Sequence, residues 1–393
     1  VSNIPRKISN IVELMKLAAL LEDFPPEADR IHLANGTLFL DGTFTEGKPE
    51  IVRCRLPVAY NPNAPAPARW LAFLDELLYP EDFPSLQEFI GYCLIPSNKG
   101  QRMMVVKGNG GEGKSQIGVV LSTLFGGNMK DGSIGKISEN RFARADLEHV
   151  LLCVDDDMRM EALRQTNYVK SIVTAQGKMD LERKGRQSYQ GWMCARLLAF
   201  SNGDLQALFD RSDGFYRRQL VLTTKEKPVD CVDDPDLSEK MKAEIEGIFL
   251  WAFAGLQRLV ANNFKFTESQ RTRENREAVK RDNNNVFDFL ESEGYIRLKA
   301  DASISSKELY EAYQIYCAEN NLTTMKPRSF SDAVIGSQSR YNLEYCNNVT
   351  NAAGRRVRGF FGIEALVHPN ISVFSGDPLR TYVPRDAPEE WRV

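Results

Sequence analysis

Residues 103–126 read MMVVKGNGGEGKSQIGVVLSTLFG, and the organisation of the whole chain follows from this stretch. The mostly apolar run Met103–Lys107 predicts a buried strand. The apolar residues after Ser115 recur at helical spacing and predict a helix that runs to Gly126. The glycine-rich loop between them therefore joins a strand to the N-terminus of a helix, an arrangement that suits phosphate binding.

This loop satisfies the pattern G-x-x-x-x-G-K-[ST], whose glycines let backbone N–H groups point toward a phosphate. Its residues are Gly108, Asn109, Gly110, Gly111, Glu112, Gly113, Lys114 and Ser115. We expect Lys114 to reach the β and γ phosphates of ATP and the Ser115 hydroxyl to complete the coordination of Mg²⁺. A GTPase is disfavoured, because the segment 98–101 lacks the aspartate that a guanine site requires.

Composition limits the class of protein. With 393 residues, of which 42% are hydrophobic and 26% charged, the chain has room for two or three domains. It has no apolar run near the ~20 residues of a membrane span and no signal-peptide pattern, so a cytoplasmic location is expected. Because the first residue is Val rather than Met, the sequence is consistent with a part of a longer polypeptide.

The seven cysteines are dispersed and form no C-x-x-C pair, and the three histidines are isolated. This pattern argues against a disulfide framework, a zinc ribbon or an imidazole-bound metal. The net charge of −3 means that any nucleic-acid site must be a local basic patch.

A second buried strand is predicted at 150–154, and it ends at Asp155, Asp156 and Asp157. Carboxylates at the carboxyl end of a parallel strand lie where ligands of such sheets bind. One of them is expected to hold Mg²⁺ through water, and a neighbour to polarise the water that attacks the γ phosphate. The pattern leaves open which aspartate has which role.

Two further strands carry polar side chains at their ends. The run 197–200 precedes Asn202, whose amide is placed to contact the γ phosphate or the attacking water. Arg217 and Arg218 stand directly before the strand 219–222. An arginine at such a position suits insertion into the nucleotide site of a neighbouring subunit, where a guanidinium stabilises transition-state charge, and either arginine could serve.

A basic hairpin is predicted over residues 174–187, as a strand, a charged tip and a return strand. Lys184 and Arg186 lie at its tip. Basic side chains on such a tip can grip the phosphates of single-stranded DNA in a central channel.

The C-terminal third divides at the polar stretch 282–285. Before it, residues 232–282 are expected to be largely helical, with a buried apolar stripe. After it, three helices are expected at 286–293, from a capping box at Ser305 and Glu308 through Tyr316, and near 328–335. Two strands at 341–345 and 355–363 complete the pattern of a winged-helix module. The last segment, 369–393, is expected to be an extended tail.

This module contains a basic patch within an acidic protein. The segment from 326 to 358 has six basic residues and two acidic ones. The basic residues are Lys326, Arg328, Arg340, Arg355, Arg356 and Arg358, and the acidic ones are Asp332 and Glu344. Guanidinium groups suit phosphate contacts, so Arg355, Arg356 and Arg358 are expected to bind duplex DNA. Docking of the module on another protein remains an alternative.

Taken together, these motifs resemble those of the superfamily 3 helicases of the phage, plasmid and poxvirus primase-helicase type. The most specific similarity is their compact order, since all of them fall within about 110 residues from Gly108 to Arg218. Residues 60–115 also resemble the lead-in of that family. The chain departs from the family in its three successive aspartates and in Thr174-Ala175-Gln176-Gly177, where the family often has Thr-Gly-Gly-Asp.

The resemblance implies an α/β fold with an AAA+-like P-loop ATPase core. It also implies a ring, usually a hexamer, that moves along single-stranded DNA in the 3′ to 5′ direction and unwinds forked DNA of a mobile element in a bacterial or phage-infected cell. Primases or polymerases are implied as partners. The expected domains are an N-terminal helical collar or oligomerisation region (1–85), the ATPase domain (86–280), the winged-helix domain (281–368) and the tail (369–393).

Two other functions remain open. One is an origin-binding ATPase switch that loads other replication proteins without unwinding DNA. The other is the helicase half of a primase, although the chain has neither zinc ligands nor a polymerase-like acidic site, so priming by these residues is not expected.

Overall fold

The computed structural model describes residues 4–18, 26–47, 51–158, 166–202, 213–227, 234–282, 285–320, 322, 324–350, 354–369 and 382–384. Contacts between Cα atoms divide the chain into two compact units. The first comprises residues 1–159, 167–203 and 220–272, and the second comprises 160–166, 204–219 and 273–393. No helix in the described ranges is long and apolar enough to cross a membrane.

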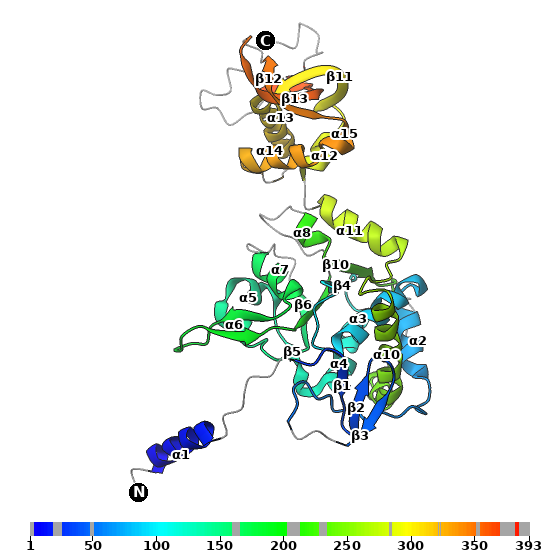
Figure 1. The fold of residues 1–393 in the computed structure, drawn as a ribbon. Coiled ribbons are helices and arrows are strands. Elements are labelled where there is room, and N and C mark those ends of the chain that lie inside the picture. The colour runs from blue at the N-terminus through cyan, green and yellow to red at the C-terminus, as the bar shows by residue number, and fades with distance from the viewer. Residues whose placement is uncertain are drawn as a thin grey trace. The chain divides into compact units, whose positions relative to one another are not determined.

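A five-stranded sheet forms the centre of the first unit (Figure 1). Its strands are β4 (Met103–Lys107), β5 (Met129–Asp131), β6 (Leu152–Met158), β9 (Arg196–Ser201) and β10 (Gln219–Thr223). They stand side by side in the order β10-β4-β9-β6-β5, and the pairs β4–β9, β9–β6 and β6–β5 are parallel. The chain is therefore a mixed α/β protein with a parallel sheet, as the alternating apolar runs predict.

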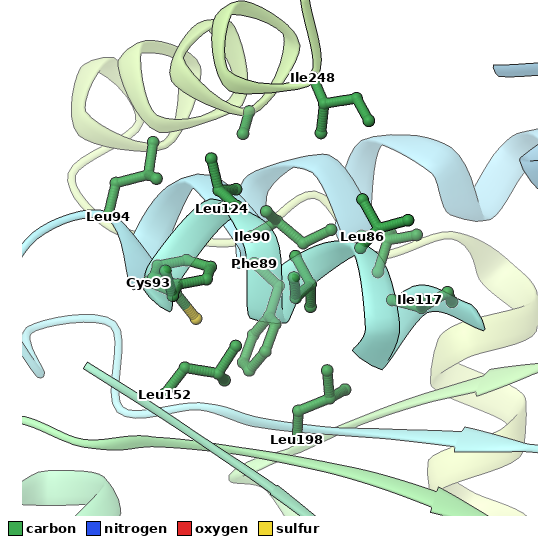
Figure 2. Packing of buried hydrophobic residues seen from close by; sticks show 14 of the residues in the cluster. Leu86, Phe89, Ile90, Cys93, Leu94, Ile117, Leu124, Leu152, Leu198 and Ile248 are labelled. Carbon is green, nitrogen blue, oxygen red and sulfur yellow. The ribbon is translucent and has the colours of Figure 1, made fainter. Parts of the chain in front are cut away.

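Three helices cover one face of this sheet: α3 (Phe83–Cys93), α4 (Ser115–Phe125) and α10 (Ile245–Ala261). Figure 2 shows Leu152 and Leu198 of the sheet pointing toward α3 and α4, and Ile248 of α10 lying on their far side. All three side chains are fully buried. Most of the apolar stripe predicted on α10 is likewise buried, so the helical extension shares the core of the sheet.

The N-terminal residues of the first unit join the same core. They form α1 (Ile4–Ala18), β1 (Arg30–His32), β2 (Gly36–Phe39), β3 (Phe44–Glu46), α2 (Ala68–Leu77) and the 3₁₀ turn η1 (Pro80–Asp82). Strands β1 and β2 form an antiparallel hairpin around Asn35-Gly36, with Ile31 opposite Leu38. Since Leu38 and Trp70 are buried in the cluster that contains the sheet residues, no boundary between cores falls at residue 85.

The remaining elements of the first unit surround the other parts of the sheet. They are η2 (Gly126–Asn128), α5 (Ile134–Glu139), α6 (Arg141–Ala145), α7 (Asn167–Thr174), β7 (Lys178–Leu181), β8 (Tyr189–Trp192) and α9 (Leu237–Lys242). α5 contacts β6, and α7 contacts β9. Strands β7 and β8 form an antiparallel hairpin. The predicted hairpin is thus present, but residue 174 ends α7 rather than beginning a strand.

The second unit has its own apolar cluster, which includes Phe289, Tyr313 and Phe330. Its helices are α8 (Asp213–Tyr216), α12 (Asn285–Glu291), α13 (Ser306–Glu319), α14 (Pro327–Gly336) and α15 (Gln338–Tyr341), and most of α11 (Gln270–Asp282) also belongs to it. Its strands are β11 (Ile296–Ser305), β12 (Glu344–Thr350), β13 (Arg356–Ala365), β14 (Val367–Pro369) and β15 (Tyr382–Pro384). The predicted capping box is present at the start of α13, because the Ser305 and Glu308 side chains each bond the other residue's backbone N–H.

The antiparallel order β11-β13-β12 differs from the expected two-stranded wing, since β11 is an additional strand. The segment around Tyr341 belongs to α15 and not to a strand. Within the expected tail, residues 382–384 pair with β14, and the other residues beyond 369 lie outside the described ranges.

Candidate functional site

The phosphate loop joins β4 to α4 as predicted. Gly110, Gly111 and Gly113 have φ angles of 101°, 83° and 95°, in the left-handed region that favours glycine. A Cβ on Gly108 would lie 2.6 Å from Lys114 Nζ and 2.5 Å from Thr224 Oγ1, so a larger residue would displace these side chains. The loop backbone therefore depends on its glycines.

The Glu112 carboxylate lies within this loop. It accepts hydrogen bonds from the backbone N–H groups of Asn109 and Gly110 (2.9 Å to the latter) and from Lys114 Nζ at 2.7 Å. Burial opposes ionisation of Glu112, but these bonds outweigh it and lower its pKa. The loop N–H groups and the lysine thus converge on an anion, which is the property that a phosphate site needs.

Asn202 reaches the same lysine. Its Oδ1 accepts a hydrogen bond from Lys114 Nζ at 3.1 Å. The sheet order explains this contact, because β9 lies between the loop strand β4 and the acidic strand β6. The side chain after β9 therefore lies next to the loop, as its place at a strand end predicts.

The acidic cluster differs from its prediction in one respect. Strand β6 does not end at residue 154 but continues through the three aspartates to Met158, because its pairing with β9 extends to Ser201 after a register shift. Asp155 is buried, and one of its carboxylate oxygens accepts the backbone N–H of Ile134 at 2.7 Å. Asp156 and Asp157 are exposed.

The three carboxylates therefore lie in different environments. Burial raises the pKa of Asp155, and the charges of Asp157 and Asp156 raise it further, while the bond from Ile134 acts against the rise. Asp155 therefore has a fixed orientation at the start of α5, whereas its two neighbours face solvent.

The two arginines before β10 lie in different surroundings. Arg218 is half-buried, and its Nη1 donates to the Gly214 carbonyl of α8. Arg217 is exposed and has no hydrogen bond or ion pair with the residues that the structure describes.

A pocket of about 320 Å³ opens beside the loop. Apolar side chains of Phe73, Leu77 and Leu237 and polar side chains of Gln116 and Lys225 line it, together with the backbone of the loop. Sequence motifs did not reveal this pocket, because its walls come from α2, α4 and residues 225, 227, 234, 235 and 237. The sequence signal was that Phe73 lies within residues 60–115, which resemble the lead-in of the helicase family.

The β7–β8 hairpin is held at the end that carries its turn. Tyr189, which pairs with Leu181 next to the turn, donates through Oη to Glu148 at 2.6 Å, and Arg183 within the turn donates to the same carboxylate at 3.1 Å. Lys184 and Arg186 are exposed at the tip, as predicted.

In the second unit, Arg355, Arg356 and Arg358 are all exposed. Arg356 and Arg358 alternate with Val357 along β13 and therefore point to the same face of the sheet. Arg340, another base of the predicted patch, pairs with Glu291 at 2.7 Å. Arg356 and Arg358 on β13 are thus exposed, whereas Arg340 lies in an ion pair.

Two family profiles match parts of the chain. Residues 106–218 match one described as "Family of unknown function (DUF5906)", a range that runs from the end of β4 to Arg218. Residues 281–337 match one described as "Poxvirus D5 protein-like". The second match confirms, for that part of the chain, the predicted resemblance to poxvirus-type primase-helicases. No curated protein matches the chain.

Solved structures of the NrS-1 C-terminal region are similar to this chain. One, in its A form without ligand, has 12% sequence identity and a TM-score of 0.49, with 90% of each chain covered. Another ligand-free structure, of residues 305–718, has 12% identity and a TM-score of 0.45, with 78% of this chain and 77% of that chain covered.

Proposed function

We propose that this protein is an ATP-dependent DNA helicase that acts in the replication of a phage, plasmid or other mobile element. The observation that carries the proposal is the convergence of the loop N–H groups, Lys114 Nζ and Asn202 Oδ1 beside a parallel sheet. In chain order, β4, β6 and β9 are the first, third and fourth strands of the sheet, and β9 lies between the other two. This strand order supports an AAA+-like core.

In this proposal ATP enters with its phosphates in the loop. The β and γ phosphates take over the N–H groups of Asn109 and Gly110 and the ammonium of Lys114, and Glu112 turns away. Ser115 and Asp155 offer the hydroxyl and carboxylate oxygens that Mg²⁺ prefers, and the bound ion neutralises phosphate charge. Asp156 and Asp157 are better candidates than Asp155 for polarising water, because their carboxylates are exposed.

The pocket beside the loop supports ATP as the ligand, because it can hold the nucleoside while the loop binds the phosphates. The apolar surface of Phe73, Leu77 and Leu237 can accept the adenine ring, and Lys225 and Gln116 can meet polar groups of the ribose. A pocket of this size accommodates a nucleoside but not a polymer.

Arg217 is the better candidate for a residue that acts on a neighbouring subunit. Its exposed guanidinium is available to a second chain, whereas Arg218 is held by Gly214. A ring, expected to be a hexamer, would bring Arg217 to the next nucleotide site.

DNA contacts are assigned to two surfaces. Lys184 and Arg186 on the β7–β8 tip suit a single strand in a ring channel. The second unit, with its helices and antiparallel sheet, is proposed to be a winged-helix module that binds duplex phosphates through Arg355, Arg356 and Arg358.

Strand displacement tests the proposal. The parent chain, with ATP and Mg²⁺, should separate forked DNA and require a tail of one polarity, expected to be the 3′ tail. Lys114→Ala should lose at least ~100-fold of the hydrolysis rate and all strand separation, because the transferred phosphoryl group loses its cation. A matched control, Lys130→Ala on β5, should unwind normally, since Lys130 pairs only with Asp146 at the surface.

Two outcomes would contradict the proposal. Hydrolysis retained in Lys114→Ala would refute the phosphate site. DNA-stimulated hydrolysis without strand separation would refute the helicase and favour a switch that loads other replication proteins.

A further inference from the structure

Two thiols from distant parts of the chain meet outside the nucleotide site. Cys54 follows the N-terminal sheet, and Cys194 lies just before β9, yet their thiols lie close enough to interact with each other. Each thiol also lies near a carbonyl of the same short segment: Cys54 Sγ is 3.6 Å from the His149 oxygen, and Cys194 Sγ is 3.7 Å from the Val150 oxygen.

The surroundings of this pair are positively charged. Arg53 Nη1 contacts the His149 ring, 2.8 Å from Nδ1. Arg196 is 1% exposed and donates to the carbonyls of Cys93 (2.7 Å) and Cys194. Among the residues that the structure describes, Arg196 has no ion pair with a carboxylate, so its charge acts on the thiols beside it.

The two thiols therefore differ in acidity. The neighbouring Cys54 thiol lowers the pKa of Cys194 against the effect of burial, and the charges of Arg196 and Arg53 lower it further. The Cys194 thiol, together with burial, raises the pKa of Cys54. Such a pair places a thiol that ionises more readily next to a second thiol that can complete a disulfide.

Small molecules have a route to Cys194. This residue lines a cavity of about 190 Å³ whose walls also include Lys99, Gln176 and Trp192. Although Cys194 is only 4% exposed, its side chain contributes to this cavity. The volume admits a small dialkyl disulfide but not a folded protein.

We propose that Cys54 and Cys194 form a redox-active dithiol that small disulfides oxidise to an intramolecular disulfide. The Cys194 thiolate attacks one sulfur of the dialkyl disulfide, forms a mixed disulfide and releases an alkyl thiolate, which takes up a proton. Cys54 then loses its proton and attacks the Cys194 sulfur, and the second alkyl thiolate leaves and is protonated. Two protein thiols and one dialkyl disulfide thus become one protein disulfide and two alkyl thiols.

Two other cysteines of the first unit, Cys93 and Cys153, provide internal controls. Burial raises the pKa of Cys153 to about 12 and that of Cys93 to about 11. Their thiols should therefore remain protonated at neutral pH and react slowly.

Peptide mapping of the full chain tests the proposal. The reduced protein is incubated with 2-hydroxyethyl disulfide, quenched in acid, alkylated, digested and analysed by mass spectrometry. The Cys54–Cys194 peptide pair should form at least ~10-fold faster than any adduct on Cys153. A reductant should reverse it.

Three variants sharpen the test. Cys54→Ser should accumulate the mixed disulfide on Cys194, and Cys194→Ser should leave Cys54 unmodified. Cys153→Ser should form the pair at the parent rate. The proposal is overturned if the folded parent chain forms no Cys54–Cys194 pair, or if Cys194 reacts no faster than Cys153. Because this mapping uses the parent chain, a variant that fails to fold would not prevent a decision.

Discussion

At the scale of single residues, the loop contains its own competitor for the nucleotide. Glu112 and Lys114 side chains are 5% and 7% exposed, and their ion pair is only 2.7 Å long. The same carboxylate binds the loop N–H groups of Asn109 and Gly110. An entering phosphate must replace Glu112 on all of these donors, so part of its binding energy is used to break existing bonds.

Glu112→Gln should therefore bind nucleotide more tightly. The amide keeps an acceptor for the loop but removes the charge that pairs with Lys114. We expect the Kd for ATP to fall about fivefold, corresponding to ~1 kcal/mol. Equilibrium titration with a fluorescent ATP analogue measures this change.

Glu139→Gln is the matched control for that titration. Glu139 is exposed at the end of α5, outside the loop, and its substitution should leave the Kd unchanged. An unchanged or weaker affinity in Glu112→Gln would mean that Glu112 supports the loop and does not compete with phosphate.

At the scale of elements, a buried carboxylate joins α3 to the helical extension. Glu88 is fully buried, and its oxygens accept hydrogen bonds from Arg258 Nε (2.6 Å), Thr267 N–H (2.7 Å) and Thr267 Oγ1 (2.8 Å). One side chain thus satisfies donors on α10 and on the segment before α11. Since α10 contacts both α3 and α4, this contact also supports the helix that begins at the phosphate loop.

Glu88→Ala should destabilise the first unit by about 3 kcal/mol, because it leaves three donors without their acceptor. Urea unfolding followed by fluorescence measures the change. Glu81→Ala is the matched control, since Glu81 pairs with Arg271 at 3.2 Å on the exposed surface. Glu81→Ala should lower the free energy of unfolding by less than ~1 kcal/mol. Equal costs for the two variants would show that Glu88 does not connect these elements.

At the scale of the whole molecule, DNA binding must arise from local charge, because the net charge is −3. Such a local charge comes from three exposed arginines: Arg355, directly before β13, and Arg356 and Arg358 on β13. Arg297 of the same unit pairs with Glu364 at 3.3 Å. We expect Arg355, Arg356 and Arg358 to release counterions from DNA.

Replacing Arg355, Arg356 and Arg358 by Ala should weaken duplex binding and reduce the slope of log K against log salt concentration by about 2 to 3. Anisotropy titrations of labelled duplex at several salt concentrations measure this slope. Arg297→Ala, the control, should keep the parent slope. If the triple variant kept the same slope as the parent chain, docking of this unit on a protein would be favoured instead.

The phosphate loop and its flanking elements could be predicted closely because their signals are local. Strand β4 has the predicted bounds, and α4 begins at the residue after Lys114. The capping box at Ser305 was also visible, since its partners are three residues apart. Strand β11 was missed, because most of its residues are exposed and its pairing with β13 uses backbone groups that any sequence offers.

The sequence by itself therefore determined the phosphate loop, the buried strands and the positions of polar residues at their ends, because hydrophobic periodicity and glycine conformations act over a few residues. Only the tertiary structure decided the strand order that brings Asn202 to Lys114, the pocket beside the loop and the contact between Cys54 and Cys194. These features depend on packing between segments that are far apart in the chain, and such packing leaves no periodic signal in the sequence.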